Sequence, residues 1–350
     1  VGKRQPVFKG EQWLRNASQQ ERMTEQGARK VPLVGGGVIG GGWATRCLAN
    51  GLEVVLADPR AESRDYVEKM VADAWPVLED AGFVTGEKGQ LYFASDIAEA
   101  VSDADFVQEN VPEREELKIA VHEEISQHAR ADVVIASSSS GWPPSRLQSR
   151  CAHPERLIIG HPFAPVYLLP LVEIVGSEQT APAAVAKAGE FYRSIGMRPL
   201  HVRREIEAYI ADRLQESLYR EALHLIDQGV ATVAEIDAAV TGGPGLRWAF
   251  MGTFLAWHLG GGPGGMRHAI EQFGPALELP WSHMKAPELT DELKRRIVQG
   301  CEEESGARVF DDMERRRDRC LAEIQKVLKE HWYPAEEDGW PRMVNADNEQ

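Results

Sequence analysis

Short apolar runs alternate with amphipathic stretches from Lys30 onward. The apolar runs predict buried strands at residues 31–34, 53–57, 106–110, 133–136, 157–160 and 171–175. Several stretches between them, for example 61–81 and 114–129, repeat with the period of a helix. Strands that alternate with helices indicate βαβ units, so this part of the chain is predicted to be an α/β domain with a mostly parallel sheet of the Rossmann type.

The pattern becomes purely helical after about residue 203. One face of a long predicted helix carries an apolar residue at every fourth position: Ile206, Ile210, Leu214, Leu218 and Ala222. Gly229 can end this helix, and Thr232 with Glu235 predicts a capping box that opens the next one. The expected organisation is a poorly ordered arm (1–29), an NAD-binding Rossmann domain (30–204), an all-helical substrate and dimerisation domain (205–332) and an acidic tail (333–350).

The charge, the apolar runs and the cysteine spacing of the chain exclude several classes of protein. The chain has 39 Lys and Arg against 54 Asp and Glu, a net charge of −15, which argues against nucleic acid or an anionic membrane as the main partner. No apolar run is long enough for a membrane span, and the first residues lack the apolar core of a secretory signal. The four cysteines are scattered without metal-ligand spacing, so we expect no metal site and a cytoplasmic protein with reduced thiols.

A glycine-rich turn follows the first predicted strand directly. Gly35, Gly37 and Gly40 form G-x-G-x-x-G, with Val38 and Ile39 opening a helix. In a strand–turn–helix context this motif is typical of dinucleotide binding: its glycines allow a tight turn and close approach of a pyrophosphate, which the helix N-terminus attracts.

An acidic residue ends the second predicted strand. Asp58 lies 23 residues after Gly35, where a carboxylate accepts hydrogen bonds from the adenosine ribose. A carboxylate there repels a 2′-phosphate, which favours NAD over NADP. Arg60 lies close enough to leave the preference open.

Two further polar groups follow strands at the ligand-binding edge of such a sheet. A run of four serines, 137–140, follows one strand, and His161 follows another. Glu173 lies 12 residues after His161 inside an otherwise apolar strand, and a buried carboxylate needs a partner. His161 is the natural candidate, because a carboxylate orients the imidazole and favours its protonated form, which suits proton abstraction from a hydroxyl. A purely structural His–Glu pair is the alternative.

With these motifs in place, the chain resembles the 3-hydroxyacyl-CoA dehydrogenase superfamily over roughly residues 30–330. The segments that carry the resemblance are GGGVIGGGWA, QENVPER, the SSSSG turn, HPF-P-VYLLPLVE and AYIADRL. Within the superfamily, PVYLLPLVEIVG, FYRSIGMRPL, GLRWAFMGTF and GGMRHAIEQFGP are most similar to bacterial L-carnitine 3-dehydrogenases. L-gulonate 3-dehydrogenase with lambda-crystallin, and the acyl-CoA enzymes themselves, are the alternative relatives.

The resemblance implies roles for individual residues. His161 matches the catalytic base, Glu173 its partner, and Ser140 the serine that hydrogen-bonds the reacting oxygen. Glu113 and Lys118 match positions that contact the nicotinamide half of NAD.

Three positions depart from the superfamily pattern that the resemblance implies. Asp212 stands where the acyl-CoA enzymes have a catalytic-site asparagine. Ala164 stands where the family usually has Asn, and Ala208 where it usually has Gly. None of these positions belongs to the Ser–His–Glu set.

The implied reaction is NAD-dependent oxidation of the 3-hydroxyl of L-carnitine to 3-dehydrocarnitine. A trimethylammonium group cannot donate hydrogen bonds, so its recognition relies on aromatic faces and carboxylates. Trp248 and Phe254 are candidates for an aromatic cage, and Arg247 for the substrate carboxylate. For each, a core, interface or surface-pair role is the alternative. The resemblance also implies a homodimer through the helical domain, and a crystallin-like structural or NAD-sensing protein remains the non-enzymatic alternative.

Overall fold

The computed structural model describes residues 29–283 and 285–331. The predicted acidic tail, and the predicted arm apart from Arg29, lie outside these residues. The described part divides into two compact units, one of residues 29–139 and 143–204, the other of residues 140–142 and 205–331. Among the described residues, no helix is long and apolar enough to cross a membrane.

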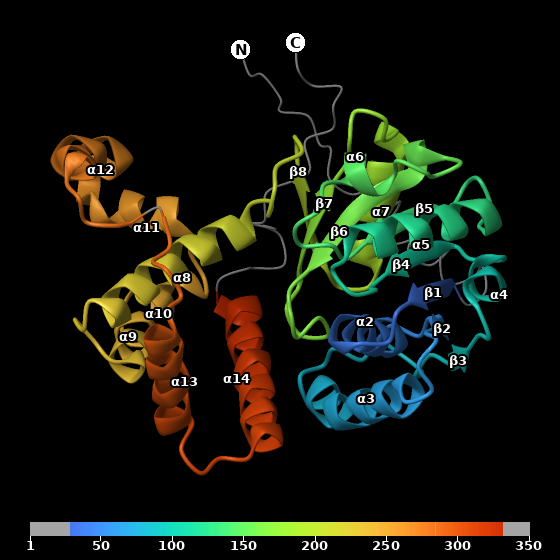
Figure 1. Ribbon diagram of the computed structural model, residues 1–350, viewed down its shortest axis with the longest axis horizontal. Helices are drawn as coiled ribbons and strands as arrows, with labels where there is room; N and C mark the ends of the chain where they lie inside the picture. The colour runs from blue at the N-terminus through green and yellow to red at the C-terminus, as the bar shows by residue number, and fades with distance from the viewer. Residues whose placement is uncertain (1–28, 284, 332–350) are drawn as a thin grey trace, which may run out of the picture. The chain divides into compact units, whose positions relative to one another are not determined.

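The first unit is built on one eight-stranded sheet in the order β3-β2-β1-β4-β5-β6-β7-β8 (Figure 1). Its strands are β1 (Lys30–Val34), β2 (Glu53–Ala57), β3 (Leu91–Phe93), β4 (Phe106–Glu109), β5 (Val134–Ser137), β6 (Leu157–Pro162), β7 (Leu171–Val175) and β8 (Arg198–Val202). All neighbours are parallel except β6 and β7. The predicted mostly parallel sheet is therefore confirmed. The sequence pattern missed β3 and β8, the two edge strands, which are short or interrupted by polar residues.

Helices cover both faces of this sheet. They are α2 (Val38–Ala49), α3 (Ser63–Asp80), α4 (Ile97–Val101), α5 (Glu115–His128), α6 (Pro144–Leu147) and α7 (Pro182–Ser194), with a 3-10 turn at Pro154–Arg156. Because successive side chains of a strand point to opposite faces, Val107 of β4 packs with Val121 and Ile125 of α5. Its neighbour Phe106 instead stacks on Phe191 of α7, with ring centroids 3.9 Å apart.

The second unit contains only helices among its described residues. They are α8 (Ala211–Asp227), α9 (Val233–Thr241), α10 (Pro244–Trp248), α11 (Thr253–Gly260), α12 (Gly265–Phe273), α13 (Asp291–Ser305) and α14 (Phe310–His331), with 3-10 turns at Gly262–Gly264 and Gly274–Glu278. Both halves of the predicted capping box at Thr232 and Glu235 are present. The predicted fold class, a Rossmann-type domain followed by a helical domain, is confirmed.

The start of the long helix was predicted wrongly. Helix α8 begins at Ala211, so Ile206 and Ile210 precede it. The backbone turns at Ala208 and Tyr209, whose φ angles of 56° and 45° lie in the left-handed region and are incompatible with a right-handed helix. The buried Tyr209 side chain holds this turn by donating a 3.0 Å hydrogen bond to the carbonyl of Trp142.

The apolar face predicted for this helix is largely exposed. Leu214 and Leu218 expose 63% and 43% of their surface, while the buried residues of α8 are Leu223 and Ile226, nearer its C-terminal end. Exposed large apolar side chains recur in the other helices of the unit, among them Leu246, Phe254, Leu259, Ile270 and Leu277. Most of the exposed large apolar side chains among the described residues thus lie in the helical unit.

Candidate active site

The glycine-rich turn lies between β1 and α2, as the motif requires. Gly35 has a φ of +99°, and a Cβ at Gly40 would lie 1.9 Å from the carbonyl oxygen of Gly35. A side chain at either position would therefore disrupt the turn. A Cβ at Gly37, by contrast, would meet no atom within 4 Å, so this backbone borders open space. Close packing on one side and open space on the other fit the turn to a dinucleotide pyrophosphate.

The N-terminus of α2 completes this cradle. Gly37 is its N-cap, and Val38, which is exposed, and Ile39 form its first turn. No side chain caps this end by hydrogen bonding. The positive end of the helix dipole is thus presented where phosphate oxygens would lie.

Asp58 follows β2 and is tied to the same turn. Its Oδ2 accepts a 2.7 Å hydrogen bond from the backbone N–H of Gly36, and its side chain is 5% exposed. Burial alone would raise the pKa of this carboxyl, but hydrogen bonds from the Arg60 side chain and the Gly36 and Arg60 backbones lower it to about 2. Asp58 is therefore anionic at any physiological pH.

His161 and Glu173 form a buried pair between β6 and β7. The strands are antiparallel, and the two residues are direct partners in the register. Nδ1 of His161 lies 3.0 Å from Oε2 of Glu173, and the two side chains are 4% and 0% exposed. A carboxylate can only accept a hydrogen bond, so Nδ1 carries the proton and Nε2 holds the lone pair that can accept another. The arrangement can act as a general base.

The hydroxyls of three serines in the run donate hydrogen bonds to three different side chains. Ser137 donates to Glu109 at 2.5 Å, Ser138 donates to the side-chain oxygen of Asn110 at 2.8 Å, and Ser139 donates to Glu113 at 2.5 Å. These bonds connect the end of β5 to the end of β4 and to the loop that follows it. Ser140 is exposed and begins the segment 140–142, which groups with the helical unit.

Two family models match the chain in succession. Residues 30–206 match the 3-hydroxyacyl-CoA dehydrogenase NAD binding domain, and residues 209–300 match the C-terminal domain of the same family. The chain belongs to the 3-hydroxyacyl-CoA dehydrogenase family. NAD is accordingly its cofactor, which agrees with the glycine turn and Asp58.

Two relatives in this family are identical to the chain at about half of the aligned positions. The chain is 50% identical over 316 residues to an L-carnitine dehydrogenase of Bacillus cereus, covering 89% of this chain and 97% of the relative. It is 54% identical over 292 residues to an L-carnitine dehydrogenase of Burkholderia mallei, covering 83% and 91%. A solved structure of an NAD⁺-dependent 5-formyl-3-hydroxy-2-methylpyridine 4-carboxylic acid 5-dehydrogenase matches with a TM-score of 0.75 and 28% identity, covering 86% of this chain and 99% of that one.

The side chain of Lys118 is completely buried in this member of the family. Its ammonium donates to both oxygens of Glu109, at 2.9 and 3.2 Å, and to the carbonyl of Val111 at 3.1 Å. It also lies 3.4 Å from Oε2 of Glu113, whose side chain is partly exposed. Lys118 therefore fixes the β4–α5 loop, and Glu113 is the member of this group nearest the surface.

Glu109 and His122 are polar residues of this group that the sequence analysis missed. Both side chains are fully buried, with Nε2 of His122 3.1 Å from Oε2 of Glu109. Burial would raise the pKa of Glu109, but Lys118, His122 and Ser137 lower it to about 2. Glu109 ends β4, whose sequence FVQE also contains Gln108, so the signal that singled out Glu173, a lone charge within an apolar strand, is absent here.

The remaining predicted residues belong to the helical unit. Asp212 is half-buried in the first turn of α8. Arg247 and Trp248 lie in the last turn of α10, and Phe254 lies in the first turn of α11. Trp248 and Phe254 are exposed, so neither belongs to a core of this unit.

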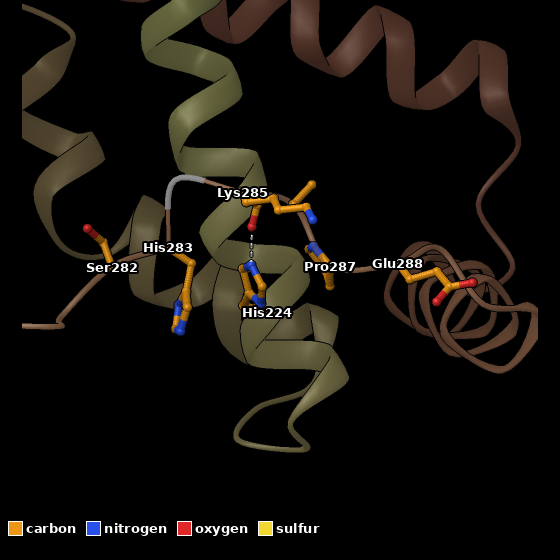
Figure 2. A pocket seen from close by; sticks show the side chains of 7 residues that line it. His224, Ser282, His283, Lys285, Pro287 and Glu288 are labelled. Atoms are coloured by element: carbon orange, nitrogen blue, oxygen red, sulfur yellow. Dashed lines mark hydrogen bonds between the residues drawn. The ribbon is translucent and has the colours of Figure 1, made fainter.

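The helical unit also contains an open pocket of about 870 Å³ (Figure 2). It is lined by His224, Ser282, His283, Lys285, Ala286, Pro287 and Glu288. The ring centroids of His224 and His283 lie 4.2 Å apart. Nε2 of His224 donates a 2.6 Å hydrogen bond to the carbonyl oxygen of Lys285. None of the residues predicted to bind substrate lines this pocket.

Proposed function

We propose that this chain catalyses the NAD-dependent oxidation of the 3-hydroxyl group of L-carnitine to 3-dehydrocarnitine. The buried His161–Glu173 pair carries this proposal, because it is a base of the kind that alcohol oxidation needs, within a unit that belongs to an NAD-binding family. The relatives named L-carnitine dehydrogenase support the choice of substrate, since the similarity extends over nearly their whole length.

His161 is the proposed proton acceptor. With Nδ1 donating to Glu173, Nε2 takes the proton of the substrate hydroxyl, and the Glu173 carboxylate stabilises the resulting imidazolium. When bound, NAD⁺ supplies the acceptor for the hydride that leaves C3 of the substrate. Ser140 is the proposed hydrogen-bond partner of the reacting oxygen, and Asp212 a further polar residue of the site.

The proposed cofactor residues divide by the part of NAD that they would hold. Gly35, Gly37, Val38, Ile39 and Gly40 form the cradle for the pyrophosphate. Asp58 would accept from the adenosine ribose. Glu113 would lie at the nicotinamide half, positioned by Lys118 and Ser139.

The proposed substrate residues are Arg247, Trp248 and Phe254. Trp248 and Phe254 expose 43% and 79% of their surface, so their ring faces are available to a quaternary ammonium group. Trp257, by contrast, packs edge-to-face on Phe273 with centroids 5.2 Å apart. Arg247 would pair with the substrate carboxylate.

A homodimer through the helical unit is part of the proposal. Exposed large apolar side chains recur along α8, α11 and α12, and contiguous exposed apolar surface on a folded unit is typical of an interaction site. A second copy of the same unit would bury such a surface through a two-fold interface. Light scattering coupled to size exclusion tests this directly, and a monomer at micromolar concentration contradicts it.

The function is tested by NADH formation at alkaline pH with NAD⁺ and, in parallel, L-carnitine, D-carnitine, L-gulonate and 3-hydroxybutyryl-CoA. We expect turnover with L-carnitine alone. Turnover confined to L-gulonate or to the CoA ester would overturn the substrate and keep the Ser–His–Glu set. No turnover with any of the four, while NADH still binds, would favour a structural or NAD-sensing protein.

The role of the base needs its own variant. His161→Gln should abolish turnover and leave NADH affinity nearly unchanged, because the glycine turn and Asp58 follow other strands, β1 and β2. Surviving turnover in this variant would show that another group is the base.

A further inference from the structure

Gln108 of β4 carries a buried side-chain amide that is bonded at both ends. Its Oε1 accepts a 2.7 Å hydrogen bond from the hydroxyl of Tyr192 on α7. Its Nε2 donates to the hydroxyl of Ser138 at 2.8 Å and to the carbonyl of Gly160 at 3.1 Å. Because a carbonyl can only accept, the contact with Gly160 fixes the orientation of the amide and makes Tyr192 the donor.

These bonds continue the connection between β5 and β6 beyond the end of their backbone pairing. The parallel register of the two strands ends where Ser137 lies opposite Ile159. The next residues along the two chains are Ser138 and Gly160, the two groups to which Gln108 donates. One side chain from β4 therefore bridges the two chains at the point where the ladder stops.

The hydroxyl of Ser138 has a single arrangement in this network. It accepts from Gln108 and, at 3.1 Å, from Nε1 of Trp43 on α2. Nδ2 of Asn110 donates to the backbone carbonyl of Gln108 at 3.0 Å, which leaves Oδ1 of Asn110 to accept from Ser138 at 2.8 Å. With one donated and two accepted bonds, the hydroxyl has no capacity left for a ligand. Ser138 therefore holds the chain in place, two residues before Ser140.

Tyr192 anchors the network from the helix side. Its fully buried ring stacks on Trp43 and packs edge-on against Phe106, with centroids 5.4 Å apart in each case. Gly160 leaves the space that the hydroxyl needs, since a Cβ there would lie 1.8 Å from Oη of Tyr192. Burial raises the pKa of the Tyr192 hydroxyl well above its usual value, so it stays protonated and keeps donating to Gln108 in alkaline solution.

We propose that Gln108 is a positioning residue for the oxidation: it sets the spacing between the chain that leads from β5 to Ser140 and the strand β6, which carries His161. It acts through these two elements, because its own amide is buried and fully bonded. The proposal rests on the proposed function, in which Ser140 and His161 act on one hydroxyl group. Misplacing such groups by about 1 Å can lower a rate by about 100-fold, so the spacing affects kcat rather than binding.

The test compares Gln108→Met with the wild type in steady-state oxidation of L-carnitine at saturating NAD⁺. Methionine keeps the length of the side chain but cannot donate to Ser138 or Gly160. We expect kcat to fall about 10- to 100-fold, while KM changes by less than roughly two-fold. Tyr192→Phe removes one bond and leaves Gln108 in place, so it should lower kcat about 3- to 10-fold. This milder variant replaces Gln108→Met if the latter does not fold.

Gln148→Met is the matched control. Gln148 is also a buried glutamine of the sheet unit, and its Nε2 donates to the hydroxyl of Ser177 at 2.7 Å. Ser177 follows β7 at the end that pairs with Ile159, not with His161. Removing this amide should lower the Tm but leave kcat and KM unchanged.

Backbone hydrogen exchange, followed by mass spectrometry without substrate, tests the positioning independently of turnover. In Gln108→Met, exchange should become about five-fold faster or more in the peptides that contain Ser138 and Gly160, as for the loss of a hydrogen bond. The peptides of β1 and β2 should keep their wild-type rates. In Gln148→Met, the peptides with Ser138 and Gly160 should also keep theirs.

Three results would each overturn the proposal: an unchanged kcat, a rise in KM alone, or unchanged exchange at Ser138 and Gly160. Equal losses of kcat in Gln108→Met and Gln148→Met would overturn it too, since the loss would then follow from lower stability. A wild type that does not oxidise L-carnitine would instead contradict the proposed function. The exchange rates would then still decide whether Gln108 holds the two chains.

Discussion

His161 and Glu173 are direct cross-strand partners, and Nδ1 of His161 lies 3.0 Å from Oε2 of Glu173. Their separation is set by the hydrogen-bonded register of β6 and β7 rather than by a loop. Because residues directly opposite on neighbouring strands project to the same face of a sheet, the two side chains meet on one side of it. The rigid strands thus hold the imidazole in one orientation before any ligand binds.

Removing the negative charge of Glu173 should slow the chemical step. Glu173→Gln keeps the size of the side chain and an oxygen that can accept from Nδ1, but it removes the charge that stabilises the imidazolium. We expect kcat to fall about 100-fold or more, within the range for general-base catalysis, while NADH affinity stays unchanged. Steady-state rates with L-carnitine between pH 6 and pH 10 measure this. Wild-type activity across that range would make the pair structural.

The buried carboxylate of Glu109 should make the sheet unit sensitive to acid. Its pKa is lowered in the fold, so it stabilises the protein above the pKa of the unfolded chain, near 4.5. This stabilisation is lost as pH falls from 4.5 toward 2. The change from 4.5 to about 2 corresponds to about 3 kcal/mol at about 1.4 kcal/mol per pKa unit.

Glu109→Gln tests this sensitivity. The variant leaves the buried Lys118 ammonium with only the partly exposed carboxylate of Glu113, so at pH 6 it should be less stable by about 3 kcal/mol. Urea unfolding at pH 6, 4 and 3 should show the difference from wild type shrinking as pH falls. The exposed Asp132→Asn serves as control, with a difference that stays small at all three values. A constant difference for Glu109→Gln would contradict the assignment of the shift to this residue.

The turn before α8 carries measurable backbone strain. Ala208 has a φ of 56°, a region that costs a residue with a Cβ about 1–2 kcal/mol. Ala208→Gly relieves this strain and costs some unfolded-state entropy, so we expect a net gain of about 0.5–1 kcal/mol. Thermal unfolding should show a higher Tm. The matched control is Ala222→Gly within α8, which should lower stability by about 1 kcal/mol.

Periodicity and motif spacing predicted much of the sheet unit. The glycine turn and Asp58 were recognised from their position after predicted strands. The His161–Glu173 pair was recognised from a charge within an apolar strand. Both signals are visible in a single sequence. Glu109 was missed because its strand also contains Gln108, and because its partners Lys118 and His122 lie on the following helix and fit an amphipathic pattern.

Other features depend on tertiary structure that periodicity does not report. The four-residue apolar repeat includes Ile206 and Ile210, but the left-handed turn at Ala208 and Tyr209 keeps this segment out of the helix, and α8 begins only at Ala211. The occupation of Asp58 by Arg60 required a choice of side-chain rotamer that spacing does not specify. Likewise, spacing suggested no separate partners for Ser137, Ser138 and Ser139.

Trp248 gives the most direct test of substrate recognition in the helical unit. A ring face contributes about 0.5–2 kcal/mol to binding a quaternary ammonium group, both before and during hydride transfer. Trp248→Ala should therefore raise the KM for L-carnitine about 3- to 30-fold while kcat changes little. Trp281→Ala is the control, since Trp281 is also exposed in this unit and is not proposed to bind substrate. Steady-state kinetics at saturating NAD⁺ separate the two constants. A loss in kcat equal to the rise in KM would place Trp248 outside the ammonium site and assign it to the structure of the unit.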